Sequence, residues 1–271
     1  MVSSTTTSNN KNKPIAVFDS GVGGLTVYKK IKELLPNEDY IYFGDLKNCP
    51  YGQKSKQQLI DLTADIFNYF KYEDVKAVVM ACNTTSAITY EKLKNNYNFK
   101  IYPIIQTVCS TLAKLDGINS LGVIATPATI NSHAYSKGIA KYNKNMNVYE
   151  LAAPNWVRIV EEHRIHQPQS IEQIKEILEI MEQNTPDKIV LACTHYPYLL
   201  DVLKKFMPED KFIDPALYFA QNIKEDLEKN NLLGKEHTYE RFYVSSNPEN
   251  FKIASELFYK LDKLPELVQM L

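Results

Sequence analysis

The sequence has no excess of charge of either sign and no long apolar run. Its 31 Lys and Arg residues and 32 Asp and Glu residues leave a formal net charge of −1. No stretch approaches the roughly 18 continuous apolar residues that a membrane-spanning helix needs. Without a positive field, nothing in the composition attracts this chain to nucleic acid or to an anionic membrane surface. We therefore expect a protein that binds neither.

The chain also has few cysteines and no secretory signal. Its first ten residues contain neither a basic start nor an apolar run, so they do not have the pattern of a signal peptide. The four cysteines are widely scattered, at Cys49, Cys82, Cys109 and Cys193. Because disulfide frameworks are typical of small secreted domains, free thiols in a reducing cytoplasm are the simplest interpretation.

Motifs for cofactors are missing as well. No Gly-x-Gly-x-x-Gly or Walker-type sequence is present, and no lysine stands out as a Schiff-base candidate. His163 and His166 are spaced for one face of a helix, but a zinc site has no obvious source for its third and fourth ligands. These absences argue against a bound cofactor and against a zinc site.

Short apolar runs alternate with segments of helical periodicity from Lys13 onward, whereas residues 1–12 are polar and predict a disordered tail. The predicted strands are 13–18, 40–45, 77–82, 101–105, 121–126 and 188–193. The predicted helices are 25–31, 59–70 and 170–183, the last with Ser170 as its cap. Apolar strands that alternate with helices are typical of parallel sheets covered on both faces. The predicted fold class is therefore α/β.

A weak internal repeat relates the two halves of the chain. One predicted strand leads into Cys82 and another into Cys193. Each is preceded, at a similar separation in the sequence, by a strand that ends in polar residues. These are Asp19-Ser20 before Cys82 and Thr126 before Cys193. Ligands of open α/β sheets bind at the carboxyl ends of the strands. We therefore expect two similar α/β units whose thiols lie on opposite sides of one cleft.

Two opposed thiols suit the inversion of a carbon stereocentre, which needs a base on one face and an acid on the other. A free cysteine has a pKa of about 8.5, and helix N-termini or nearby cations lower it. A single cysteine at a strand end is more often a small buried hydrophobe, but two in matching contexts offset that expectation. Cys49 and Cys109 lack such a context, so we expect them to be structural.

Five motifs in order resemble the glutamate racemases, a bacterial enzyme family. They are Asp19–Val27, Phe43-Gly44-Asp45, Pro50-Tyr51-Gly52, Ala81–Thr84 and Ala192–Pro197. The similarity begins near Lys13 and continues through residues 242–251 to the end of the chain.

The resemblance implies two similar α/β domains, each a mostly parallel sheet flanked by helices, facing each other across a central cleft. It implies a first domain of residues 13–106 plus 220–271, a second of residues 107–219, no cofactor and no metal. Cys82 would be the base toward D-glutamate and Cys193 the base toward L-glutamate, with Asp19 and His195 assisting. The implied substrate contacts are Asp19, Ser20, Tyr51, Gly52, Asn83, Thr84, Thr126, Thr194 and His195. A cytoplasmic homodimer that supplies D-glutamate for peptidoglycan is the expected context.

The chain departs from the family's pattern in one segment, where Asn155, Trp156 and Arg158 are candidates to change the cleft rim or the subunit contacts. Two other functions remain open. An aspartate racemase, or one of broad specificity, is the nearer alternative, although many of those carry Glu where this chain has His195. A two-lobed protein that binds an acidic amino acid without turnover is the more distant alternative, and it has no need of Cys82 and Cys193.

Overall fold

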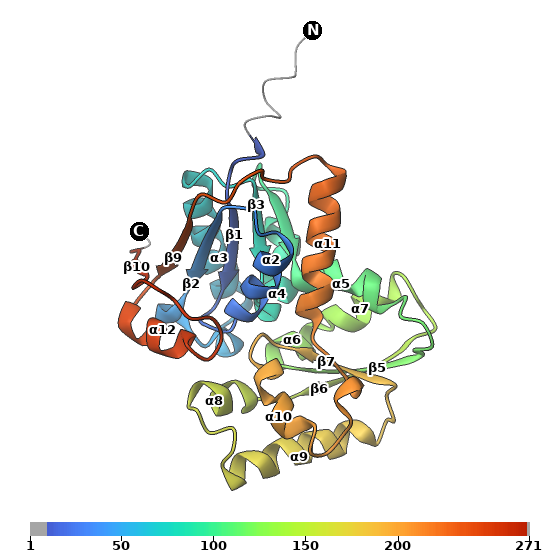
Figure 1. The fold of residues 1–271 in the computed structure, drawn as a ribbon. Coiled ribbons are helices and arrows are strands. Elements are labelled where there is room, and N and C mark those ends of the chain that lie inside the picture. The colour runs from blue at the N-terminus through green and yellow to red at the C-terminus, as the bar shows by residue number, and fades with distance from the viewer. Residues whose placement is uncertain (1–9, 270–271) are drawn as a thin grey trace. The chain divides into compact units, whose positions relative to one another are not determined.

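The computed structural model describes residues 10–269, which divide into two compact units (Figure 1). The first comprises the described residues through Ile104 and from Ala216 onward, and the second is Ile105–Pro215. Most of the predicted tail, residues 1–9, lies outside the described residues. Lys11 belongs to a turn just before the expected start of the fold, and its carbonyl oxygen accepts a hydrogen bond of 2.8 Å from Lys76 Nζ.

The first unit contains a six-stranded sheet in the order β10-β9-β2-β1-β3-β4. Its strands are β1 Ile15–Asp19, β2 Tyr40–Gly44, β3 Ala77–Met80, β4 Lys100–Pro103, β9 Glu240–Val244 and β10 Glu266–Leu267. All of the pairings are parallel. Every residue of β1, β2 and β3 is buried, as the sequence predicts for a parallel sheet covered on both faces.

Helices and short 3-10 turns connect the strands of the first unit. They are α2 Leu25–Leu34, η1 Leu46–Asn48, η2 Tyr51–Gln53, α3 Lys56–Tyr72, α4 Asn83–Leu93, α11 Pro215–Lys229 and α12 Pro248–Ser255. Helix α3 begins with a capping box, in which Ser55 and Gln58 each accept a hydrogen bond from the other's backbone N–H. Its inner residues Phe67 and Phe70 pack onto the sheet in one aromatic-rich core.

A buried ion pair links distant segments of the first unit. Lys76 Nζ pairs with Glu38 and also donates to the carbonyl oxygens of Lys11 and Leu232, the latter at 2.9 Å. The other Glu38 oxygen accepts from the backbone N–H of Gly234 at 2.7 Å. Because each charge is hydrogen-bonded as well as paired, the cluster meets the condition under which a buried ion pair is tolerated.

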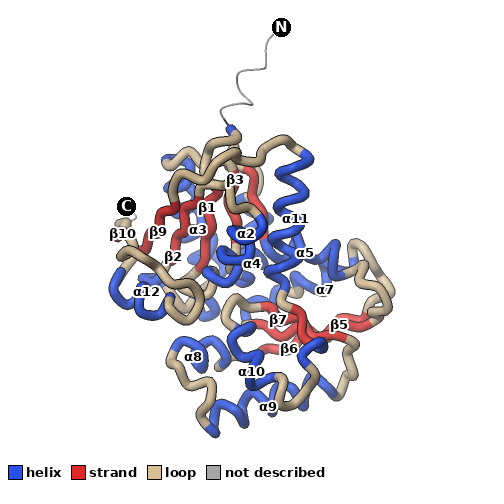
Figure 2. Tube along the Cα trace, in the orientation of Figure 1, coloured by secondary structure: helices blue, strands red, loops and turns tan. Residues whose placement is uncertain are grey.

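The second unit contains a four-stranded parallel sheet in the order β6-β5-β7-β8. Its strands are β5 Ser120–Ala125, β6 Asn147–Ala152, β7 Lys188–Ala192 and β8 Phe212–Ile213. Its helical segments are α5 Ile104–Leu112, α6 Pro127–Ser132, α7 Ala134–Ala140, α8 Trp156–Glu161, α9 Pro168–Glu182, η3 Tyr196–Leu199, α10 Leu200–Leu203 and η4 Glu209–Lys211. Strands lie beside helices throughout the unit (Figure 2).

The two sheets share one topology. The order β2-β1-β3-β4 in the first unit matches β6-β5-β7-β8 in the second, and β9 and β10 extend only the first. In each sheet the chain runs from a central strand, β1 or β5, to the neighbour on one side, β2 or β6, and then to the neighbour on the other side, β3 or β7. This reversal of strand order creates a switch point between β1 and β3 and between β5 and β7. The predicted α/β class and the internal repeat are both confirmed. No helix among the described residues is long and apolar enough to cross a membrane.

Two local predictions are wrong for identifiable reasons. Ser170 does not cap α9, because the helix already begins at Pro168, whose missing N–H and fixed φ suit the first helical position. Trp156 does not lie at an exposed rim: it is 1% exposed and packs edge-on against Tyr196 with ring centroids 5.0 Å apart. Trp156 and Ile159 share the inner face of α8, while Arg158 points to solvent.

Candidate active site

Each of the two cysteines follows a strand at a switch point. The last pair between β1 and β3 is Phe18 with Met80, and both Ser20 and Cys82 lie two residues further on. The last pair between β5 and β7 is Ala125 with Ala192, and the next residues are Thr126 and Cys193. Each thiol therefore has a hydroxyl residue at the same level of the neighbouring strand. Ligands of doubly wound sheets bind at such positions.

The first candidate site combines Cys82 with the Asp19–Gly24 turn. Cys82 Sγ lies 3.9 Å from Ser20 Oγ, and Cys82 is buried to 6% exposure. Asp19 is fully buried, and its Oδ2 accepts the backbone N–H of Gly21 at 3.0 Å. The turn after β1 thus brings a carboxylate and a hydroxyl to the end of the strand beside the thiol.

Helix α4 begins directly after Cys82, which is its N-cap residue. Thr85 Oγ1 donates to the Cys82 carbonyl oxygen at 3.0 Å and so holds the cysteine backbone at the helix start. The first turn is polar and buried, with Asn83, Thr84, Thr85 and Ser86. Because a helix N-terminus stabilises negative charge, this position favours a thiolate or a substrate carboxylate.

Tyr42, on β2, holds the Asp19–Gly24 turn in place through a hydrogen bond. Its buried hydroxyl donates to the Gly21 carbonyl oxygen at 2.7 Å. Burial, with a smaller effect from the negative charges of Asp19 and Cys82, raises the pKa of Tyr42 well above its ordinary value, so the hydroxyl keeps its proton. A Cβ atom at Gly24 would lie 2.3 Å from Asp19 Cβ, so only glycine fits there. Tyr42 was not singled out by the sequence.

Tyr51 is held by the carboxylate of Asp45, which belongs to the Phe43-Gly44-Asp45 motif but had no role assigned from the sequence. The Tyr51 hydroxyl donates to Asp45, and Asn48 Nδ2 donates to both Asp45 oxygens at 3.0 and 3.1 Å. The Asp45 backbone N–H in turn donates to the Asp19 carbonyl oxygen at 3.1 Å. Burial and the neighbouring Asp45 raise the pKa of Tyr51 well above its ordinary value. Gly52 follows in η2 and is half-buried.

The second candidate site joins Cys193 to His195 and Glu161. His195 Nδ1 lies 3.9 Å from Cys193 Sγ and 3.4 Å from Thr194 Oγ1. His195 Nε2 lies 3.0 Å from Glu161 Oε1. Burial alone lowers the pKa of His195, but its hydrogen bonds to Cys193 and Glu161 outweigh burial and raise the pKa to about 10. The sequence did not indicate a role for Glu161, because Glu161 and His195 are 34 positions apart in the chain and meet only in the fold.

Thr126 is the N-cap residue of α6 and is half-buried. Its Oγ1 lies 3.1 Å from Thr129 Oγ1. The predicted residues therefore form one group in each unit. The first group is Asp19, Ser20, Tyr51, Gly52, Cys82, Asn83 and Thr84, and the second is Thr126, Cys193, Thr194 and His195.

The remaining cysteines lie apart from these groups. Cys109 is fully buried, with its Sγ 3.9 Å from the Tyr135 carbonyl oxygen, and burial raises its pKa to about 12. Cys49 is half-buried. Among residues 10–269, no group of three or more His, Cys, Asp or Glu side chains is arranged to hold a metal ion.

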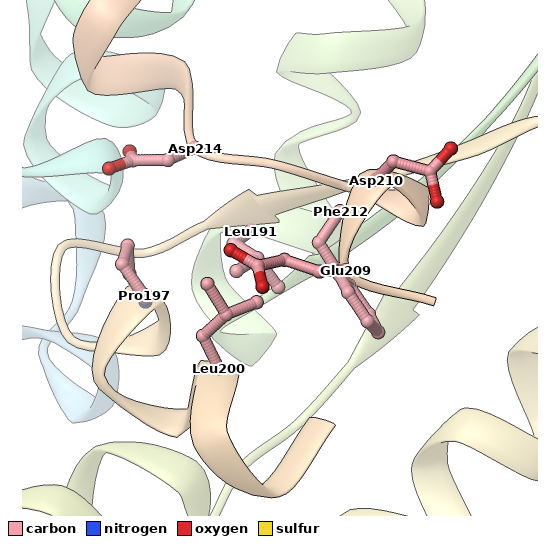
Figure 3. A pocket seen from close by; sticks show the side chains of 7 residues that line it. All are labelled: Leu191, Pro197, Leu200, Glu209, Asp210, Phe212 and Asp214. Carbon is pink, nitrogen blue, oxygen red and sulfur yellow. The ribbon is translucent and has the colours of Figure 1, made fainter. Parts of the chain in front are cut away.

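A pocket of about 500 Å³ opens beside β7 and β8 in the second unit (Figure 3). Its lining is mixed, with apolar and acidic side chains and none of the predicted site residues. The lining residues are Leu191, Pro197, Leu200, Glu209, Asp210, Phe212 and Asp214.

Fold and site together define a two-unit α/β protein that carries one thiol at the switch point of each parallel sheet. The family described as Asp/Glu/Hydantoin racemase matches residues 15–223. The chain belongs to this family.

Individual relatives are similar over nearly the whole chain. The glutamate racemase of Thermoanaerobacter pseudethanolicus is 38% identical over 248 residues, which cover 91% of this chain and 93% of that protein. The glutamate racemase of a Nostoc species is 39% identical over 243 residues, or 88% of this chain and 82% of that protein. The crystal structure of glutamate racemase from Francisella tularensis in complex with D-glutamate is 36% identical, covers 96% of this chain and 98% of that one, and has a TM-score of 0.88.

Proposed function

We propose that this chain is an isomerase that interconverts L-glutamate and D-glutamate without a cofactor. The observation that carries the proposal is the pair of cysteines at matching switch points in a member of the racemase family. The similarity to glutamate racemases, one of them crystallised with D-glutamate, supports glutamate as the substrate.

In the proposed mechanism each thiol serves one face of the α-carbon. The Cys193 thiolate removes the α-proton of L-glutamate, and the Cys82 thiol delivers a proton to the opposite face to give D-glutamate. In the reverse direction Cys82 is the base and Cys193 is the acid. His195, in contact with Cys193, and Asp19, on the turn beside Cys82, assist their neighbouring thiols. The mechanism requires both thiols to reach the same carbon from opposite sides.

The energetic demand explains why the surrounding groups are polar. If the α-proton is roughly ten pKa units less acidic than a thiol, its transfer to a thiolate is unfavourable by a free energy on the order of 14 kcal/mol. Preorganised donors that act on the developing negative charge are the usual means of closing such a gap. The buried first turn of α4 and the imidazole of His195 supply donors of this kind.

The substrate's amino and carboxylate groups are proposed to contact residues from both units. The N-terminus of α4 suits a carboxylate, because its backbone N–H groups and helix dipole favour negative charge. The proposed contacts are Asp19, Ser20, Tyr51, Gly52, Asn83, Thr84, Thr126, Thr194 and His195.

Solvent exchange tests the proposal most directly. With pure L-glutamate in heavy water, the enzyme is expected to place deuterium on the α-carbon and to accumulate D-glutamate. Mass spectrometry and chiral chromatography measure the two products. A folded protein that binds glutamate but introduces no deuterium would overturn the proposal and favour the non-catalytic binder.

The choice between glutamate and aspartate depends on initial rates. His195 occupies the position where many aspartate racemases carry Glu, so we expect faster turnover of glutamate. A clearly higher kcat/KM for aspartate would overturn this assignment. The proposal extends to a cytoplasmic homodimer that supplies D-glutamate for peptidoglycan; sedimentation measures the dimer, and rescue of a D-glutamate-requiring bacterium tests the supply.

A further inference from the structure

The segment that follows strand β9 contacts the end of β2 at three points. Beyond the last residue pair of these strands, the Ser245 backbone N–H donates to the Gly44 carbonyl oxygen at 3.2 Å. Ser245 Oγ accepts the backbone N–H of Lys47 at 2.9 Å. The ring of Phe251 lies so close to Gly44 that an added Cβ atom there would be 2.7 Å from Phe251 Cε2. The proposed mechanism gives this segment no role, although the sequence resembles the racemases there as well.

Ser245 caps η1 in place of the N-cap residue of that turn. The first N–H groups of a helix have no partner within the helix, and an Asp at the N-cap commonly accepts one of them. Asp45 is the N-cap residue of η1, yet its side chain makes no cap hydrogen bond. The Asp45 carboxylate accepts instead from the Tyr51 hydroxyl and from Asn48 Nδ2. The Lys47 N–H therefore has its acceptor in a residue 198 positions away in the chain.

We propose that Ser245 is a positioning residue for the reaction: by capping η1, it leaves the Asp45 carboxylate available to hold Tyr51 at the substrate. This proposal rests on the proposed function, in which Tyr51 contacts glutamate. Ser245 is not among the proposed substrate contacts, so it acts through the η1 turn. Without the Ser245 hydroxyl, the Lys47 N–H loses its acceptor, and the usual acceptor at that position is the N-cap side chain. We then expect Asp45 to turn toward Lys47 and to release Tyr51.

The backbone of Asp45 is held in place, so a change in its bonding is confined to its side chain. The Asp45 N–H donates to the Asp19 carbonyl oxygen at 3.1 Å. Asp45 and Tyr51 are each only 2% exposed. Because both side chains are buried, water does not readily replace the Asp45 oxygen, and an unpartnered buried hydroxyl is costly. A Tyr51 side chain released by Asp45 is therefore expected to move, which changes its contact with the substrate.

The first test compares Ser245→Ala with Ser246→Ala in the racemisation of glutamate. Ser246 is the adjacent, half-buried serine and makes none of the contacts described above. Tyr51 is proposed to contact substrate groups that do not react, so its release is expected to raise KM and to change kcat less. We expect kcat/KM of Ser245→Ala to fall about tenfold, the upper range for one net hydrogen bond, and that of Ser246→Ala to stay unchanged. Ser245→Thr keeps a hydroxyl and is expected to recover most of the loss.

A double-mutant cycle with Tyr51→Phe provides the decisive readout. Tyr51→Phe removes the hydroxyl that Asp45 holds. If Ser245 acts through that hydrogen bond, Ser245→Ala causes no further loss of kcat/KM once Tyr51→Phe is present. Independent effects would instead multiply. A double variant whose loss of kcat/KM equals the product of the two single losses would overturn the proposal and leave Ser245 with a general effect on the fold.

Hydrogen exchange followed by mass spectrometry tests the same turn without turnover. In Ser245→Ala, peptides that cover residues 46–53 are expected to exchange faster than in the wild type and in Ser246→Ala, because η1 and η2 are no longer held together. Peptides from β1 and β3 are expected to exchange at the wild-type rate, which shows that the variant is folded. Faster exchange throughout the first unit would overturn a local role.

The two measurements separate the positioning role from the proposed function. Absence of racemisation by the wild-type chain would count against the proposed function itself, and the exchange of residues 46–53 would still test the cap. A racemising wild type with unaltered KM in Ser245→Ala would count against the positioning role alone.

Discussion

Replacement of Gly24 by alanine tests whether the position of Asp19 controls activity. The added Cβ would lie 2.3 Å from Asp19 Cβ and 2.8 Å from the Tyr42 hydroxyl oxygen. Carbon atoms pack favourably at about 3.5–4.0 Å, so Asp19 must move by roughly 1 Å. Overpacking of this kind costs about 1–3 kcal/mol of stability. A misplacement of about 1 Å near the reacting groups costs on the order of 100-fold in rate.

The assay pairs this variant with Gly117→Ala. Gly117 has φ +72° and no other atom within 4 Å of an added Cβ, so alanine there introduces backbone strain of about 1–2 kcal/mol without a clash. Urea unfolding is expected to show similar destabilisation in both variants. Circular dichroism of glutamate is expected to show a loss of kcat/KM only in Gly24→Ala. If both variants lost activity equally, or if Gly24→Ala kept wild-type activity, the reasoning about Asp19 would be refuted.

Three further predictions address the thiols and the buried ion pair. Cys82→Ser and Cys193→Ser are each expected to abolish racemisation with little change in the thermal transition, and loss of that transition would instead mean a structural cysteine. Lys76→Met is expected to cost about 3–5 kcal/mol in urea unfolding, because Glu38 stays buried without its cation; recovery in the Glu38→Leu/Lys76→Met double variant checks this cause. Cys109 is expected to resist iodoacetamide near neutral pH until the protein unfolds, because burial raises its pKa to about 12; mass spectrometry of the native protein checks this, and rapid labelling would contradict it.

The sheets and the positions of the thiols were predictable because they depend on local sequence. Strands β1, β3, β5 and β7 are short, mostly apolar runs, and a polar residue follows each of them within three positions. The prediction extended β3 to Cys82, whereas the structure ends it at Met80. The Ala81 backbone N–H still donates to the Phe18 carbonyl oxygen of β1 at 2.9 Å, and the chain then turns into α4, with Cys82 as the N-cap residue. Predicted strand ends were therefore close, and the order of the strands was not predictable from local patterns.

The partners of the site residues were not predictable in the same way. Glu161 lies in a segment that departs from the family pattern, and only the tertiary fold brings it to His195. Asp45 was visible as part of a motif, but its contact with Tyr51 depends on the two 3-10 turns between β2 and α3. Trp156 was expected at a rim because sequence composition alone does not show which face of a short helix is buried.

The first unit is interrupted in sequence, and this affects how it can form during synthesis. Strand β9, at Glu240–Val244, pairs with β2, at Tyr40–Gly44, although the whole second unit separates them in the chain. While the ribosome is still translating the region before residue 240, the β2 edge of the nascent sheet has no neighbour. An uncovered edge of this kind is a template for wrong pairing. The second unit, continuous in sequence, can fold before the first is complete.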